Sequence, residues 1–305
     1  MHVSEAAHWD QGPTAVETAT MPDLLRLTCL DDAAAQVSTW VGHPQNLPEG
    51  RSFGGLLLAQ ALLAAGRTVP KGQQVVSQQS DFIAAVPTDR PLRWEVTRLG
   101  ESPSLSTRHS RLVDAAGATL FASTTRWAVD RDDLPSYDVV RRMPAPDPES
   151  LAELHDHFSH IPQVPAWWRA RRPVNVRHVV PPSYTESRSG TDEQTVFFRS
   201  LEPLPADDPT LHAAVAAYVS DMCLVEPAFS ALGEARHAPG GLILSLTHTL
   251  TFHRPLDISD WTQCDCRVRI VAHGRAEGRS DLFGADGQLA VSASQLALVR
   301  MPYPA

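Results

Sequence analysis

Cysteine is scarce in this 305-residue sequence, which has four, at positions 29, 223, 264 and 266. So few and so scattered cysteines predict neither a disulfide framework nor a zinc site. The sequence also lacks a basic N-terminal segment followed by an apolar run, and no window approaches the roughly 18 uninterrupted apolar residues of a membrane span. We therefore expect a cytoplasmic protein with no metal or cofactor and no stable membrane insertion.

Positive charge is also in deficit. The 26 Lys and Arg residues stand against 35 Asp and Glu residues, a formal net charge of −9. This balance argues against nucleic acid or an anionic membrane as the main partner, and it remains compatible with a local basic pocket for an anionic ligand. Apolar residues make up 43% of the chain, as in ordinary globular proteins. The length predicts two domains of roughly 150 residues each.

Several catalytic signatures are missing. There is no H-E-x-x-H, no Walker A motif and no dinucleotide glycine fingerprint, so the sequence does not predict a zincin, a P-loop NTPase or a Rossmann dehydrogenase. An α/β-hydrolase with a serine nucleophile is not expected either. His155, His157 and His160 form H-x-H-x-x-H in a proline-rich stretch. We interpret these three as a solvated cluster rather than a metal site.

The most informative stretch is Leu211 to Val225, LHAAVAAYVSDMCLV, in which apolar residues recur every three or four positions. Its other faces are also mostly apolar, and a helix of this kind is normally wrapped by other structure. Asp221 lies in the middle of the predicted helix. Because burying an unpaired charge costs several kcal/mol, this carboxylate is either satisfied structurally by neighbouring groups or held as an acid or base in a dry site.

A second apolar helix is predicted over Leu56 to Val69, LLLAQALLAAGRTV, directly after Phe53-Gly54-Gly55. Glycines at a helix start expose backbone N–H groups that suit a carbonyl or an anion. Alternatively, Gly54 and Gly55 allow the helix to pack closely on its neighbours. The residues alone leave both interpretations open.

Strand-like runs surround the two helices, and they repeat. Phe82 and Phe252 are 170 residues apart, as are Gly117 and Gly287 (287 − 117 = 170) in two predicted hairpin turns. A register shared without a gap over almost fifty residues indicates an internal duplication. Each copy is then a helix wrapped by an antiparallel sheet, an α+β arrangement.

The expected organisation follows from this duplication. An N-terminal domain is predicted at 20–131, a Pro-rich linker at 132–173 and a C-terminal domain, carrying the catalytic residues, at 174–303. The expected strands are 35–41, 75–83, 92–99, 104–114 and 119–129 in the first half, and 174–179, 195–200, 242–252, 264–272, 275–283 and 288–299 in the second. A short helix is expected at 23–30.

Three sequence strings resemble one family. Arg51-Ser-Phe-Gly-Gly55 with Ala59-Gln-Ala61 is similar to its R-x-FGG-x(4)-Q-A segment, Tyr218-Val-Ser-Asp221 to its Y-x-S-D helix, and Phe252-His-Arg-Pro255 to its F-H-R-P strand end. The family is the bacterial acyl-CoA thioesterase II, or TesB-like, group, whose fold is a tandem (double) hotdog. The resemblance covers roughly residues 22–301 and is weakest in the linker. It implies hydrolysis of acyl-CoA thioesters.

The resemblance implies a hydrolytic water held by an Asp, a Thr or Ser, and a Gln of the second hotdog. By motif position these are Asp221, Ser245, which lies seven residues before the F-H-R-P string, and Gln295 in the last strand. Ser245 stands where the family most often has Thr, and it keeps the hydroxyl. The positions 170 residues before Ser245 and Gln295 are Val75 and Thr125. We therefore expect one working site per chain.

Weaker expectations concern four other residues. A backbone N–H at Gly54 or Gly55 would bind the developing oxyanion of the substrate. His253 and Arg254 either orient the site or touch a phosphate, or they fix the chain at the end of the strand.

The family implies an acyl-CoA substrate, a place in fatty acid metabolism and, by analogy, a homo-oligomer. Two alternatives stay open. A hotdog hydratase or dehydratase would show an Asp and His pair, and Asp221 has no His within a helical turn. A non-catalytic acyl-CoA-binding protein is the other alternative. It is kept open by Ser245 and by Gln78-Gln79, which occupy a stretch where the family commonly has His.

Overall fold

The computed structural model describes residues 20–45, 50–131, 133–162, 164, 166–184, 186–187, 190–236 and 241–300. The N-terminal half contains α1 (Met21–Leu24), β1 (Thr28–Cys29), β2 (Val37–Gly42), α2 (Gly54–Gly66), β3 (Gln73–Phe82), β4 (Leu92–Glu101), β5 (Leu105–Val113) and β6 (Thr119–Val129). The C-terminal half contains η1 (Pro148–Ser150), α3 (Leu154–Phe158), α4 (Ala166–Arg169), β7 (Val174–His178), β8 (Glu193–Ser200), α5 (Pro209–Cys223), α6 (Pro227–Leu232), β9 (Leu242–Phe252), β10 (Thr262–Ala272), β11 (Arg275–Phe283) and β12 (Leu289–Arg300).

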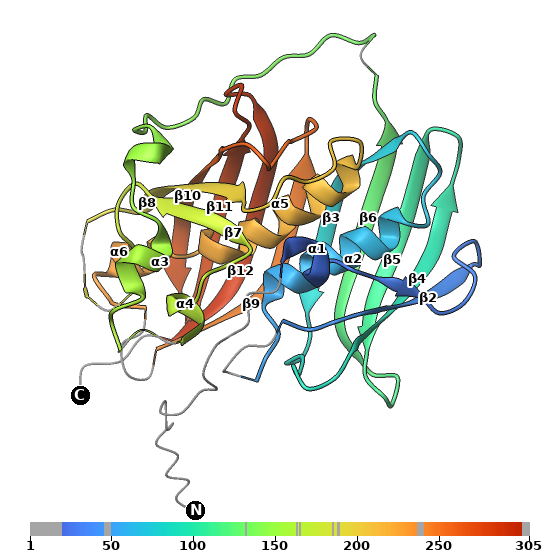
Figure 1. The fold of residues 1–305 in the computed structure, drawn as a ribbon, viewed down its shortest axis with the longest axis horizontal. Coiled ribbons are helices and arrows are strands. Elements are labelled where there is room, and N and C mark those ends of the chain that lie inside the picture. Colours follow the sequence, from blue (N-terminus) through green and yellow to red (C-terminus); the bar gives the residue numbers. More distant parts are fainter. Residues whose placement is uncertain are drawn as a thin grey trace, which may run out of the picture.

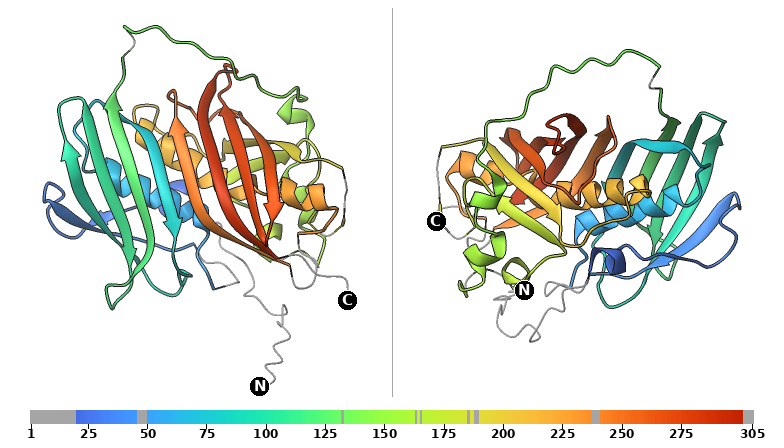
Figure 2. Two further views of the ribbon diagram at one scale, coloured as in Figure 1. Left: turned by 180° about the vertical axis from the view of Figure 1, so that it is seen from behind. Right: turned by 45° about the horizontal axis from the view of Figure 1, so that its top comes forward.

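The described strands form one sheet in the order β1-β2-β4-β5-β6-β3-β9-β12-β11-β10-β8-β7. Figure 1 shows α2 and α5 side by side over one face of this sheet, and the left panel of Figure 2 shows the strands from the opposite side. The two halves join where β3 pairs antiparallel with β9, with Gln79 opposite Thr249. A helix wrapped by antiparallel strands, present twice, is the architecture that the sequence predicts.

The two central helices, α2 and α5, run antiparallel and in close contact. A Cβ atom on Gly55 would collide with the backbone carbonyl of Tyr218 near one end. Near the other end, a Cβ on Gly66 would lie 2.6 Å from Cγ2 of Thr210. Glycine at both positions lets the helices approach each other. Close packing, one of the two interpretations that the sequence left open for these glycines, therefore applies to Gly55.

Helix α5 forms the centre of the C-terminal core, and its residues from His212 to Ser220 are all buried. The stretch Pro209–Leu232, which includes α6, is long and apolar enough to cross a membrane by length and composition. Yet 78% of its most apolar window is buried inside the protein. Enclosure by the sheet and by α2 explains why this helix is apolar on all sides.

The internal duplication extends to the irregularities of the sheet. Three residues of the first half are bulged out of their strand pairing, and the residues 170 positions later are bulged in the same way. The pairs are Val76 and Leu246, Leu99 and Arg269, and Leu120 and Ala290. Bulges re-aim side chains and are part of a fold's design. Their repetition supports a common origin of the two halves.

The predicted elements agree closely with the structure outside two regions. All expected strands are present, with ends shifted by at most two residues. The helix expected at 23–30 is wrong beyond its start, because the chain turns after Leu24 and pairs as β1 with β2. Within the predicted linker, α3 and α4 pack against the C-terminal core through Leu154, Phe158 and Trp168. The described linker residues 133–147 cross between the halves (Figure 1).

Candidate active site

Asp221 lies in the last turn of α5, and its side chain is only 5% exposed. Its Oδ1 accepts a hydrogen bond from Ser245 Oγ at 3.1 Å and another from Gln295 Nε2 at 2.6 Å. The backbone N–H of Gly55 at the start of α2 also donates to this carboxylate. The buried carboxylate is thus satisfied by three donors from three different elements.

Ser245 and Gln295 come from the neighbouring strands β9 and β12. Gln295 Nε2 also donates to Ser245 Oγ at 2.7 Å, so the three predicted residues form a closed triangle with Asp221 at its apex. Gln295 is 2% exposed, whereas Ser245 is half-buried. The structure therefore brings together three residues that span 74 positions of sequence.

Burial dominates the electrostatics of Asp221. Desolvation raises the pKa of its carboxyl from 3.8 to about 6, against the opposing effects of the hydrogen bonds from Ser245 and Gln295, the positive charge of Arg236 and the Gly55 N–H. A carboxylate with this pKa is ionised at neutral pH and is a stronger base than an exposed aspartate. This is the tuning expected of a general base.

His248 is a member of the site that the sequence reasoning missed. Its Nδ1 lies 3.9 Å from Asp221 Oδ1, and the side chain is fully buried. Asp221 has no histidine within a turn of its own helix, as the sequence shows, and His248 reaches it from β9 instead. Burial lowers the pKa of His248 to about 3, so its imidazole is neutral wherever Asp221 is charged. The contact is not an ion pair.

A bulge explains why His248 was not recognised. Strict strand alternation would place Ser245 and His248, three residues apart, on opposite faces of β9. Leu246 is bulged out of the pairing with β12, which shifts the alternation and turns both side chains to the helix-covered face. The detectable signal was the 170-residue repeat, in which Gln78 stands at the position of His248.

Among the described residues, the first hotdog has no Asp-Ser-Gln triangle at the equivalent place. At the equivalent end of the helix pair, Trp127 fills the space: its Cη2 lies 2.8 Å from where a Cβ on Gly66 would be. The Trp127 Nε1–H donates to Thr125 Oγ1 at 2.9 Å, and Val75 is buried opposite Trp127. In the second hotdog the position of Trp127 is taken by Ala297, which pairs with Ser245. One tryptophan thus occupies what is a polar site in the other half.

Gly54 supports the close approach of α2 to the carboxylate. A Cβ atom there would lie 2.5 Å from Asp221 Oδ2 and 2.9 Å from Cε1 of Phe82. The Gly55 N–H already donates to Asp221. The Gly54 N–H is therefore the candidate oxyanion donor.

His253 and Arg254 lie at the opposite end of β9 from Ser245, eight residues or about 26 Å along an extended strand. His253 Nε2 lies 3.1 Å from Ser292 Oγ. Arg254 donates to the Leu289 carbonyl at 2.9 Å and approaches Asp138 in the linker at 3.5 Å. The structure does not bring this pair to Asp221, and these contacts match the alternative in which they fix the strand end.

Gln78 and Gln79 differ sharply in their surroundings. Gln78 is fully buried and donates to the Leu58 carbonyl at 2.9 Å and to Ser123 Oγ at 3.1 Å. Gln79 is exposed. Gln78 therefore fixes β3 to α2 in the first hotdog.

A second serine lies in a pattern shared with known nucleophiles. Gly50-Arg51-Ser52-Phe53-Gly54 spells G-x-S-x-G, the pattern of the α/β-hydrolase nucleophile turn. Ser52 Oγ donates to the Pro87 carbonyl at 3.4 Å, and no histidine bonds it among the described residues. The surrounding sheet is antiparallel rather than the parallel sheet of that fold. The motif is therefore present in the sequence, but Ser52 does not have the structural surroundings of an α/β-hydrolase nucleophile.

Three cysteines meet in the core behind α5. The Sγ atom of Cys266 lies 3.6 Å from Sγ of Cys223 and 3.6 Å from Sγ of Cys264, and all three are buried. Structural zinc sites use four ligands, and the described part of the chain supplies three here. We assign this cluster to the packing of α5 against β10.

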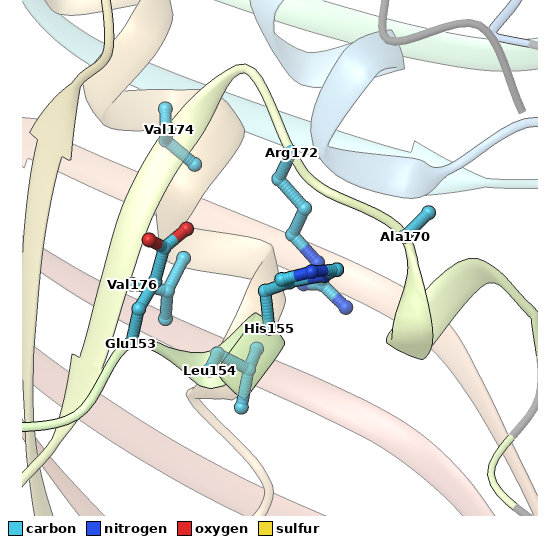
Figure 3. A pocket seen from close by; sticks show the side chains of 7 residues that line it. All are labelled: Glu153, Leu154, His155, Ala170, Arg172, Val174 and Val176. Carbon is cyan, nitrogen blue, oxygen red and sulfur yellow. The ribbon is translucent and has the colours of Figure 1, made fainter. Parts of the chain in front are cut away.

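Two pockets lie away from the triangle. One, of about 10 Å³, has room for about one water and lies between α3, the segment after α4 and β7 (Figure 3). Its lining consists of Glu153, Leu154, His155, Ala170, Arg172, Val174 and Val176. The other, of about 180 Å³, is lined by Arg254 and by three carboxylates, Asp257, Asp260 and Asp286, so its net negative charge disfavours the phosphates of CoA.

Two family models match the chain. The acyl-CoA thioesterase N-terminal domain matches residues 43–128, and the acyl-CoA thioesterase C-terminal domain matches residues 138–299. The fold and the matched domains define the class as acyl-CoA thioesterases with two hotdog domains. The chain belongs to the acyl-CoA thioesterase II (TesB-like) family, as its three sequence strings predicted.

Individual relatives are consistent in length and fold. Acyl-coenzyme A thioesterase 8 of Mus musculus is 26% identical over 273 residues, covering 86% of this chain and 82% of that protein. Acyl-CoA thioesterase 2 of Haemophilus influenzae is 24% identical over 280 residues, 91% of this chain and 96% of that protein. An acyl-CoA thioesterase II TesB2 structure from Mycobacterium marinum has a TM-score of 0.72 at 24% identity, over 93% of this chain and 99% of that one. The double hotdog prediction is confirmed.

Proposed function

We propose that this protein hydrolyses acyl-CoA thioesters with a water activated by Asp221 and oriented by Ser245 and Gln295. The observation that carries the proposal is the convergence of both side chains on one buried carboxylate oxygen, at 3.1 and 2.6 Å. A carboxylate oxygen fixed in this way by a hydroxyl and an amide holds a water in a more defined position than bulk solvent does. In the first hotdog, Trp127 fills the space that corresponds to this site. This difference supports one site per chain.

The reaction then proceeds as general-base catalysis. Asp221 takes one proton from the water while the water oxygen bonds to the thioester carbon, and the carbonyl oxygen becomes an oxyanion held by the Gly54 N–H. Collapse of this intermediate breaks the carbon–sulfur bond, and the proton on Asp221 passes to the leaving CoA sulfur. The products are a carboxylic acid and CoA.

A hydratase or dehydratase is the second candidate, and the 3.9 Å separation of Asp221 and His248 is the observation in its favour. The two side chains lie close enough to face one acyl-CoA substrate together. Hydration consumes the conjugated double bond of a 2-enoyl-CoA and leaves the thioester intact. Loss of the enoyl absorbance without release of a free thiol identifies it.

The deciding experiment measures free-thiol release from saturated acyl-CoAs of short to long chain. We expect release by the wild-type protein on part of the series, and a drop of about 10²-fold or more in Asp221→Asn, as for the loss of a general base. Binding of acyl-CoA without release on any chain length would instead identify the non-catalytic binder. The chain-length profile defines the acyl specificity.

Two other expectations remain proposals. A homo-oligomer is tested by sedimentation of the purified protein across a concentration series. A cytoplasmic location is tested by fractionation of the cells that express it.

A further inference from the structure

The hydrogen bonds around His248 fix the position of its proton. Ser220 Oγ donates its single hydrogen to the Ala217 carbonyl at 2.8 Å, and it lies 3.0 Å from His248 Nε2. Because that hydroxyl hydrogen is already used, Ser220 Oγ acts as an acceptor towards the imidazole. We assign the proton of the neutral His248 to Nε2 on this basis, which leaves a bare lone pair on Nδ1.

This lone pair of Nδ1 is buried and unmatched. Nδ1 of His248 has no hydrogen-bond partner among the described residues, and the side chain is fully buried. Leaving a buried acceptor unsatisfied is energetically unfavourable, so such an atom calls for a donor that arrives with water or a ligand. Asp221 Oδ1 lies 3.9 Å from this nitrogen. That distance is too long for a direct hydrogen bond and short enough for one bridging water.

We propose that Nδ1 of His248 is the second acceptor of the hydrolytic water, paired with the carboxylate of Asp221. The inference rests on the proposed hydrolysis. A water oxygen about 2.8 Å from both atoms would make an angle of about 90° between them, near the H–O–H angle of water. With both hydrogens engaged, a lone pair of the oxygen is left to face the thioester carbon.

The two protons of the water have different fates in the reaction, which agrees with two different acceptors, Asp221 and His248. The proton directed at Asp221 is transferred as the carbon–oxygen bond forms. The other stays on the oxygen and becomes the hydroxyl of the tetrahedral intermediate, still donating to His248 Nδ1. When the carbon–sulfur bond breaks, the proton on Asp221 goes to sulfur and the hydroxyl proton leaves with the carboxylic acid. His248 accepts a hydrogen bond throughout and gains no net charge.

A neutral imidazole is necessary for this role. A protonated ring would donate at Nδ1 and turn the water's lone pair away from the substrate. Complete burial holds the pKa of His248 near 3, so the lone pair remains available over the range in which Asp221 is ionised.

The chain offers a matched pair of substitutions. Gln78 occupies the repeat-related position on β3 and is fully buried there, so glutamine is accommodated at the equivalent place in the first hotdog. His248→Gln places an amide near the Nε2 position and removes the acceptor at Nδ1. His248→Asn places an amide oxygen at the same reach from the backbone as Nδ1. A purely structural histidine would be replaced better by glutamine than by the shorter asparagine.

The test is steady-state thiol release by the full-length chain, with melting temperature measured in parallel. We expect His248→Gln to lower kcat by about 10- to 10²-fold with KM within about threefold, and His248→Asn to recover at least part of that loss although it packs less well. Wild-type kcat in His248→Gln overturns the inference and leaves the Gln295 side-chain carbonyl, also buried without a partner, as the second acceptor. A wild-type protein without thiol release would overturn the proposed hydrolysis itself.

A measurement on the unsubstituted protein keeps the inference testable if His248→Gln does not fold. The ¹⁵N chemical shifts of a histidine ring distinguish a protonated from an unprotonated nitrogen. Hydrogen on Nε2 of His248 at neutral pH supports the inference. Hydrogen on Nδ1 overturns it, because that tautomer would donate towards the water rather than accept from it.

Discussion

Gly54 in α2 and Asp221 in α5 approach so closely that a single added carbon on Gly54 would lie 2.5 Å from the carboxylate oxygen Oδ2. The same carbon would also lie 2.9 Å from Cε1 of Phe82, so a methyl group at this position collides with both side chains. The glycine therefore sets the position of the base relative to the start of α2. This contact makes the first prediction.

Gly54→Ala should reduce kcat by about tenfold or more by displacing the Asp221 carboxylate from its water, since a misplacement of about 1 Å can cost 10²-fold. Thiol release measures the effect. Gly72→Ala is the control for a glycine substitution remote from the site, because no atom lies within 4 Å of its Cβ position, although its φ of +89° adds some strain. A Gly54→Ala protein with full activity would show that the carboxylate tolerates the shift.

The pH dependence of kcat/KM should follow the ionisation of Asp221. With the pKa raised to about 6 by burial, the base is protonated and inactive below that pH and ionised above it. The rate should therefore rise about tenfold per pH unit below pH 6 and level off above it. Because burial keeps the pKa of His248 near 3, it should add no second inflection. A plateau that extends unchanged to pH 4.5 would contradict the assignment of Asp221 as base.

Periodicity revealed most of the fold. The apolar repeat of α5 and α2 and the alternation of the strands are local properties, and they placed the strands within two residues. The pairing of β3 with β9 is not local: it depends on two edges 170 residues apart. No pattern within either strand distinguishes this partner from another edge, so the continuous sheet required the structure.

The site was predictable only in part. Family motifs named Asp221, Ser245 and Gln295, but their hydrogen-bonding geometry depends on the contact of α5 with the sheet. His248 escaped because a bulge at Leu246 reverses the alternation of β9, and a bulge leaves no clear mark in a single sequence. Burial, which decides the ionisation of both Asp221 and His248, is likewise a property of the assembled core.

Ser245 should be replaceable by the residue that its family prefers. Ser245→Thr keeps the hydroxyl that donates to Asp221 at 3.1 Å, so kcat should remain within about threefold of wild type. Ser245→Ala removes the hydroxyl that donates to the Asp221 carboxylate and should cost about 10-fold, less than Asp221→Asn, because the base itself remains. Thiol release compares the three proteins. Equal losses in Ser245→Ala and Ser245→Thr would show that shape rather than the hydroxyl matters here.

The asymmetry of the two hotdogs makes a paired prediction. Gln295→Ala should lower kcat by about 10- to 10²-fold, because it removes the amide that donates to both Asp221 and Ser245. Thr125→Val, at the repeat-related position, should leave kcat within about twofold, although it removes the bond to Trp127. Melting temperature separates this stability effect from catalysis. A comparable loss of kcat in both variants would mean that the first hotdog takes part in the reaction.

The ionised Asp221 carboxyl should also lower the free energy of unfolding at neutral pH. Its carboxyl has a pKa of about 6 in the folded protein, against 3.8 in the exposed reference state. Between these values the unfolded chain releases a proton that the folded protein keeps, so the free energy of unfolding falls as pH rises from 3.8 through 6. At 1.36 kcal/mol per pH unit the full difference is roughly 3 kcal/mol. Asparagine cannot ionise and escapes this cost.

Urea unfolding of wild type and Asp221→Asn at pH 4 and pH 8 measures the effect. The free energy of unfolding of the variant, relative to wild type, should rise by up to about 3 kcal/mol between the two pH values. His248 titrates in both proteins, so its own protonation largely cancels from the comparison. Any lost hydrogen bond to Ser245 or Gln295 shifts the difference at both pH values alike. A difference independent of pH would show that the Asp221 carboxyl keeps an ordinary pKa in the folded protein, and the general-base assignment would lose its electrostatic support.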